Sequence, residues 1–182
     1  MSSSYGDDLI HRWEAGPPMG LPSPWRATPP VAVGGLHSAG LDPSGHYLLL
    51  VSHSGRGVIE CKSGEKVARD YDEDEATWMD RQTLLATGIG PLDGASIRVA
   101  GSFIGGGLAI STRDGWHVRR MHPAWPRTYV WAEPPNEILG FTGGGTFYRM
   151  WDWDDPFAWG FSESGSTLVC VCSNTVAIWT RG

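Results

Sequence analysis

The chain contains a long internal repeat, and this repeat limits the folds that it can adopt. Residues 41–60, LDPSGHYLLLVSHSGRGVIE, align without a gap on residues 161–180, FSESGSTLVCVCSNTVAIWT, which lie 120 positions later. Each copy has a bulky residue, a polar Ser-Gly turn, an apolar run, a second turn and another apolar run. Two short apolar runs separated by turn residues are typical of a β-hairpin. The repeat therefore predicts two copies of one strand–turn–strand unit.

The rest of the chain also favours β-structure. It has 25 Gly, 13 Pro and 10 Trp among 182 residues, and no segment shows a sustained 3.6-residue apolar period. Short apolar runs alternate with turn clusters throughout, which is typical of an all-β protein. The predicted strands cover residues 46–52, 57–62, 67–70, 83–87, 96–100, 108–112, 117–121, 128–132, 137–141, 146–151, 158–161, 167–172 and 175–180.

Weaker copies of the opening of the repeat lie between its two strong copies. Residues 79–87 and 134–141 are degenerate versions of it, and the hydrophobic centres are spaced 36, 54 and 30 residues apart, at Leu48, Leu84, Ile138 and Leu168. A unit of about 40 residues with four strands has the size of a β-propeller blade. The spacing predicts about four such units.

Residues 41–52 and 161–180 resemble the blades of WD40-like β-propellers, in which a polar turn, Gly, an apolar strand and a terminal Ile-Trp occupy comparable places. The resemblance implies β-meander repeats that form a small, about four-bladed ring or an incomplete β-propeller. Neither copy ends in the usual Trp-Asp pair. An antiparallel β-sandwich is the alternative fold. Residues 52–70 and 88–94 are also similar to small bacterial proteins, a similarity that names no activity.

The N-terminal part predicts an arm that leads into one domain. Residues 16–30 contain six of the 13 prolines, and proline removes backbone donors, which excludes a helix or an inner strand. We expect a Pro-rich arm over residues 1–30 and a single propeller-like domain over residues 31–182. The start of the chain lacks signal-peptide features and no apolar run reaches about 20 residues, so no membrane contact is expected.

The expected compartment is a reducing, cytoplasmic one. Cys61, Cys170 and Cys172 are an odd number of cysteines without CxxC spacing, and free buried Cys commonly acts as a small hydrophobe. Twelve of the 14 basic residues are Arg, which is typical of a GC-rich bacterial genome.

The charge is acidic and unevenly distributed. A net charge of −6 gives no electrostatic support to nucleic-acid binding. The most acidic stretch is DYDEDE at 70–75, whereas five Arg and one acid lie between Arg98 and Arg127. A bipolar surface of this kind can steer a charged protein partner. We therefore expect Asp72, Glu73 and Asp74 to contact a protein partner; the alternative is an ordinary solvated loop.

Residue patterns for catalysis and metal binding are incomplete. Asp70, Asp72 and Asp74 match the first ligands of a calcium loop, but Glu75 and Arg81 stand where the loop requires Gly and Glu. The Cys and His residues lack zinc-ligand spacing. A GxSxG elbow is absent, and the Gly triplets at 105–107 and 143–145 lack the P-loop Lys. The sequence predicts no catalytic residue, no metal site and no cofactor.

The segment RMWDWDDPFAW at 149–159 is unusually rich in Trp and Asp. On a strand, Trp151 and Trp153 would share one face, and Asp152 and Asp154 the other. Three interpretations are open: Trp residues that fill the core, an aromatic contact for a protein partner, or a sugar-stacking platform.

Together these features predict a non-enzymatic protein-interaction module, either an immunity-type or a scaffold protein of a bacterium. The alternative function is a glycan-binding or hydrolytic domain that uses residues 151–155. Pairing of two copies that completes the propeller is a third expectation.

Overall fold

The computed structural model describes residues 11, 20–124, 127–137, 145–151 and 155–182. In this part of the chain the fold is all-β, as expected, with four antiparallel sheets. The strands are β1 (Arg26–Ala32), β2 (Leu36–Leu41), β3 (Tyr47–Ser52), β4 (Gly55–Glu60), β5 (Lys66–Asp70), β6 (Met79–Asp80), β7 (Leu85–Thr87), β8 (Ser96–Arg98), β9 (Ala100–Gly101), β10 (His117–Ala124), β11 (Arg127–Glu133), β12 (Tyr148–Trp151), β13 (Ala158–Phe161), β14 (Thr167–Val171) and β15 (Thr175–Thr180).

The internal repeat forms two matching three-stranded units. In the first, β2, β3 and β4 are neighbours; in the second, β13, β14 and β15 are neighbours. The strand registers correspond at an offset of 120 residues: Leu41 pairs with Leu48 as Phe161 pairs with Leu168. We call the sheet ordered β5-β4-β3-β2-β9 the first-repeat sheet and the sheet ordered β1-β15-β14-β13 the second-repeat sheet. The prediction of two equivalent hairpins is confirmed.

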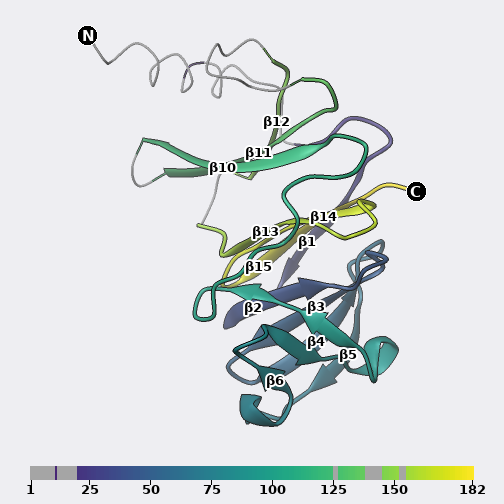
Figure 1. Ribbon diagram of the computed structural model, residues 1–182, viewed down its shortest axis with the longest axis vertical. Helices are drawn as coiled ribbons and strands as arrows, with labels where there is room; N and C mark the ends of the chain where they lie inside the picture. The colour runs from purple at the N-terminus through teal and green to yellow at the C-terminus, as the bar shows by residue number, and fades with distance from the viewer. Residues whose placement is uncertain (1–10, 12–19, 125–126, 138–144, 152–154) are drawn as a thin grey trace.

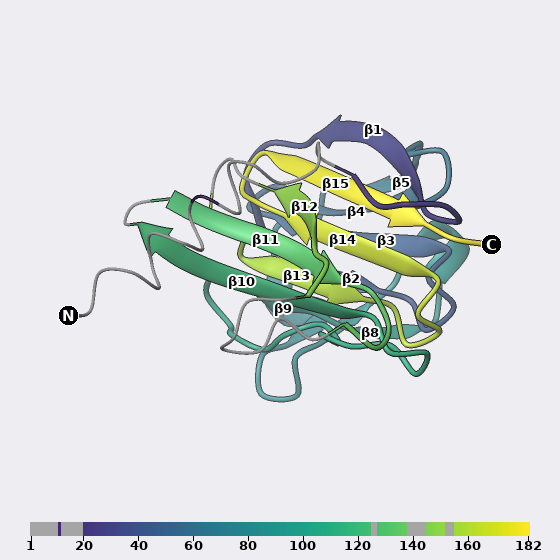
Figure 2. The same ribbon diagram turned by 90° about the horizontal axis from the view of Figure 1, so that it is seen from above.

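The two units obtain their fourth strand from different parts of the chain. In the first-repeat sheet β4 pairs with β5, the next strand along the sequence. In the second-repeat sheet the same place beside β15 is taken by β1, which Figure 2 shows at the outer edge of that sheet. The Pro-rich arm thus contributes an edge strand. Pro29 and Pro30 fall within its register shift, which agrees with the rule that proline occurs at sheet edges and bulges.

The four sheets are stacked in the order β10–β12, second-repeat sheet, first-repeat sheet and β6–β8 (Figure 1). A cluster that includes Trp116, Met150, Leu168 and Trp179 fills the first interface. Leu48, Leu50, Val169 and Ile178 belong to the second. Within the described residues, no core cluster joins the β6–β8 sheet to the β10–β12 sheet. The observed arrangement is therefore a layered stack of sheets.

The strand prediction fails in several places. Residues 108–112 form isolated bridges at Ala109 and Ser111 instead of a strand. Three observed strands, β1, β2 and β6, lie outside the expected ranges. β2 reads LHSAGL, in which His, Ser and Gly interrupt the apolar pattern although the strand is buried. Residues 138–144, which include most of the strand expected at 137–141, lie outside the described part. No helix among the described residues has the length and apolar character needed to cross a membrane.

Candidate functional site

The acidic loop at residues 70–75 is held by hydrogen bonds from its backbone N–H groups to its own aspartate side chains. The backbone N–H of Asp72 donates to Asp70 Oδ1 (3.1 Å), and that of Asp74 donates to Asp72 Oδ1 (3.0 Å). The backbone N–H of Ala76 then donates to Asp74 Oδ1 (3.3 Å). Each aspartate thus accepts from the residue two positions later, as Asp does in Asx turns. The loop ends in a 3₁₀ turn at Glu75–Thr77.

Two side chains, Trp78 just after the loop and Arg56 on β4, fasten this loop to the protein. The indole N–H of the buried Trp78 donates to the Asp72 carbonyl (3.2 Å). Arg56, on β4, donates from Nε to Asp70 Oδ2 (3.1 Å), and its guanidinium lies 4.7 Å from the Trp78 ring centroid. The Asp72 N–H and then Arg56 lower the pKa of Asp70. The loop is therefore a fixed anionic structure.

Glu75 connects the loop to a buried histidine. His37 Nε2, on β2, lies 2.8 Å from Glu75 Oε1, and Arg81 Nη2 lies 2.7 Å from Glu75 Oε2. On its other side, His37 Nδ1 is 3.1 Å from Ser38 Oγ. Burial is the main cause that lowers the pKa of His37, although Glu75 acts in the opposite direction. In neutral His37, Nδ1 can accept from Ser38 while Nε2 faces the Glu75 carboxylate.

Exposed aromatic rings flank the loop. Tyr71 is 74% exposed and Phe103 is 68% exposed. The Phe103 ring centroid lies 5.7 Å from that of His37 and 6.0 Å from that of His53. β9 brings Phe103 to this place, because it pairs with β2 at Ser38 and Gly101. A Cβ at residue 101 would lie 2.2 Å from the His37 carbonyl oxygen, so this close pairing requires glycine.

We define the acidic face as residues 71–75 with His53 and Phe103. Three of the predicted contact residues, Asp72, Glu73 and Asp74, lie on it with exposed side chains. The face therefore combines carboxylates with large aromatic groups. His53 occupies the turn between β3 and β4, where its N–H donates to the Gly35 carbonyl (3.3 Å).

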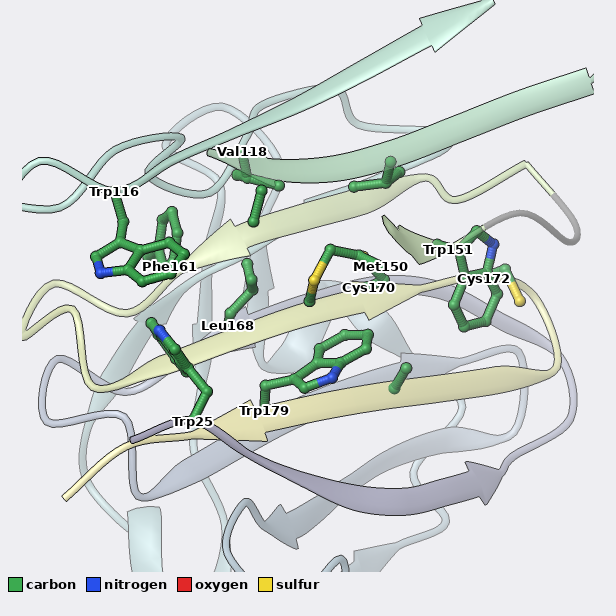
Figure 3. Close-up of a cluster of buried hydrophobic side chains, with 13 residues drawn as sticks. Trp25, Trp116, Val118, Met150, Trp151, Phe161, Leu168, Cys170, Cys172 and Trp179 are labelled. Carbon is green, nitrogen blue, oxygen red and sulfur yellow. The ribbon is translucent and has the colours of Figure 1, made fainter. Parts of the chain in front are cut away.

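The Trp-Asp segment contributes to the core at Trp151. Trp151 is 1% exposed and belongs to the cluster between the β10–β12 sheet and the second-repeat sheet (Figure 3). It fills the core, so the expectation that Trp151 offers a surface contact is corrected. The alternation of Trp and Asp cannot reveal which face of a strand is covered by another sheet. Asp152, Trp153 and Asp154 lie outside the described residues.

The acidic face does not form an assembled metal or catalytic site within the described part of the chain. The carboxylates of Asp70, Asp72 and Asp74 each accept a local backbone N–H, and no group of three or more His, Cys, Asp and Glu side chains has metal-binding geometry there. Ser38 contacts His37, but it is fully buried and cannot reach a substrate.

The cysteines are buried free thiols. Burial, followed by the charges of Asp42 and Glu60, raises the pKa of Cys61 to about 12, and burial also raises the pKa of Cys170. The thiolate is the nucleophilic form of cysteine. At neutral pH these two side chains therefore remain protonated and act as packing groups, as the sequence indicated.

The sequence did not indicate His37, Tyr71 or Phe103 as parts of the site. Phe103 is isolated in a Gly-rich stretch, and His37 precedes the recognised repeat. Their association depends on the pairing of β2 with β9, strands that are 60 residues apart in the chain. One local signal existed, since Tyr71 interrupts the run of acids at 70–75. No protein-family model and no curated protein matches this sequence.

Proposed function

We propose that the chain is a non-enzymatic protein-interaction module whose acidic face binds a positively charged surface of a protein partner. The observation that carries this proposal is the fixed, exposed loop of Asp72, Glu73 and Asp74 with Tyr71 and Phe103 beside it. Carboxylates on a surface accelerate encounter with a basic partner and contribute specificity. Aromatic side chains supply the apolar contact area that most often dominates binding energy.

The rigidity of the loop supports this function. A loop that is ordered before binding loses less conformational entropy when the complex forms. Residues 70–78 are ordered by the Asx turns, the Trp78 contact and the Glu75–His37 pair. A merely solvated acidic loop would not need these anchors.

The wider proposal is an immunity-type or scaffold protein in the cytoplasm of a bacterium, built from propeller-type units. The matching registers of β2–β4 and β13–β15 support the repeat relationship. In this proposal a second copy of the chain completes the ring. The alternative glycan-binding function has lost Trp151 as a stacking group, because its side chain is buried.

The test is a quantitative pull-down from a lysate of the source organism with the wild-type chain and the variant D72K/E73K/D74K. We expect the variant to capture at least tenfold less partner than the wild-type chain does. We also expect the salt dependence of wild-type capture to weaken in the variant, because surface attraction between charges is screened by salt.

The matched control is E65K/D93K/E163K, which makes the same charge change at three exposed acids outside the acidic face. It should capture the partner as wild type does. Equal capture by wild type and D72K/E73K/D74K would show that the acidic face is not the contact, and equal loss in both variants would show that only net charge matters.

A further inference from the structure

A large groove lies between the two repeats at the end of the first-repeat sheet opposite the acidic face. Its volume is about 1000 Å³. One wall is formed by residues 23–28, which lead into β1, and another by residues 45–47 with Glu60 and Lys62. β4 separates the two sites, because Arg56 at its start pairs with Asp70 and Glu60 at its end pairs with Tyr47. The four residue steps from Arg56 to Glu60 span about 13 Å.

The contact between the two Ser-Gly turns fixes the shape of this groove. Ser164 Oγ donates to the Ser44 carbonyl (2.7 Å), and Thr167 Oγ1 donates to the Gly45 carbonyl (2.6 Å). Across the groove, Thr28 Oγ1 donates to the Cys61 carbonyl (2.9 Å). These bonds tie both repeats and β1 together, so the groove is largely formed without a ligand.

The groove contains two free cations and a carboxylate. Arg181 is engaged by Asp114, with N···O distances of 2.5 and 2.8 Å. Glu60 accepts a hydrogen bond from the Ser63 hydroxyl, which leaves the negative charge of its carboxylate in place. Arg26 and Lys62 are exposed and have no ion pair or side-chain hydrogen bond to any described residue. Two cationic side chains therefore face this space with their donors free.

The uncharged polar groups of the groove also offer donors. The hydroxyls of Ser23 and Thr180 line it and make no hydrogen bond to the described part of the chain. Trp25, Pro24 and Tyr47 add apolar surface. Free ammonium, guanidinium and hydroxyl donors match a ligand that is rich in carboxylate acceptors.

We propose that this groove binds an extended acidic peptide segment of a protein. Its volume is at the upper end of the range of about 300–1000 Å³ that is usual for small-molecule sites. The continuous wall of residues 23–28 can lie along several residues of an extended chain, while Arg26 and Lys62 bind its carboxylates. This site has the opposite charge to the acidic face and does not rest on the function proposed for that face.

The test is fluorescence anisotropy with a labelled hexaglutamate peptide and the full chain. Wild type should bind it saturably, and R26E/K62E should weaken binding at least tenfold. The matched control R98E/R113E reverses two exposed arginines outside the groove and should stay within twofold of wild type. A circular-dichroism melt of each variant confirms that it is folded.

The contrary outcomes are distinct. Absence of saturable binding, or equal weakening by R26E/K62E and R98E/R113E, would overturn the groove as a peptide site. Binding of tripolyphosphate to the chain without any binding of the peptide would overturn the proposal in favour of a small-anion site. D72K/E73K/D74K should leave peptide affinity within twofold, because the acidic face lies beyond the Debye length of about 8 Å at physiological salt; failure of one site therefore leaves the other testable.

Discussion

The two copies of the repeat share a backbone but differ in their surroundings. Tyr47 pairs with Glu60 as Thr167 pairs with Thr180 in the second copy. Even the turn bonds correspond: the N–H of Tyr47 donates to Asp42 Oδ1 (2.7 Å), and the N–H of Thr167 donates to Ser162 Oγ (3.2 Å). A short polar side chain at the start of the turn is therefore what the unit requires, and Asp and Ser both meet this requirement.

The difference lies in the loops that each copy carries. Both repeat sheets are covered on both faces: the second by the β10–β12 sheet and the first-repeat sheet, and the first by the second-repeat sheet and the β6–β8 sheet. Both copies line the groove, but only the first is followed by the acidic loop, at the end of β5. The comparison indicates that the fold covers both copies alike, while the first copy presents the acidic contact. This division can be tested by changing equivalent places in the two copies.

The largest expected effect concerns the fourth strands. Trp25, one residue before β1, is 5% exposed, whereas Val67 on β5 is 41% exposed. Trp25→Ala should lower the free energy of unfolding by about 3–5 kcal/mol, because it leaves a cavity beside Trp116 and Phe161. Val67→Ala should cost less than about 1 kcal/mol. Urea unfolding measures both free energies. Similar losses would contradict the burial of Trp25 and the exposure of Val67.

A smaller difference is expected between the glycines of the equivalent turns. Gly45 and Gly165 have φ angles of 81° and 74°, a left-handed conformation. A Cβ at residue 45 would lie 2.6 Å from Ser162 Oγ, whereas one at residue 165 would lie 3.1 Å from Thr112 Cγ2. Gly45→Ala should cost about 2–4 kcal/mol and Gly165→Ala about 1–2 kcal/mol, since both add backbone strain but only the first adds a severe clash.

Thermal and urea unfolding of the two variants provide the measurement. If Gly165→Ala were the more destabilising, the contact between the turns would not restrict residue 45 as the structure indicates.

The smallest expected effect is the pH dependence that His37 brings to the first copy. The equivalent residue of the second copy is Phe157, 120 positions later. Because burial lowers the pKa of His37 below its unfolded value of 6.5, its contribution to stability is present above that value and is lost as pH falls through the lowered pKa. Glu75, His53 and Arg81 are the charged or titratable groups that act on it.

His37→Phe should therefore reduce the loss of unfolding free energy between pH 7.5 and pH 5. The readout is this slope rather than absolute stability, which the substitution can change by itself. Identical slopes for wild type and variant would show that His37 does not titrate with folding.

The sequence predicts those elements whose strands and turns are adjacent in the chain, and misses those that depend on distant segments. The hairpins β3–β4 and β14–β15 were predicted because Ser-Gly turns and apolar runs are adjacent in the chain. β2 escaped prediction because His37, Ser38 and Gly40 look polar or turn-like in sequence although all are buried. Ser38 is buried where β2 pairs with β9, and Gly40 lies against Ile97 and Arg98 on β8. The chain reaches both partner strands only about 60 residues after β2.

The candidate site also contains residues with a local sequence signal and residues without one. The acidic residues 72–74 were found from charge alone, and the structure places them on an exposed, anchored loop. Phe103 and His37 depend on strand pairing across the sheet. The sequence left the role of Trp151 open between core and surface, because its burial depends on the adjacent second-repeat sheet. A run of charged residues predicts solvent exposure, whereas aromatic residues occur both in cores and at binding surfaces.

The most direct test of the proposed division is hydrogen exchange of the chain with and without the partner captured by wild type. Binding should slow exchange in residues 71–78 and 101–104 and leave β14 and β15 unchanged. Slowed exchange in residues 167–180, with residues 71–78 unaffected, would contradict the account and place the contact on the second copy.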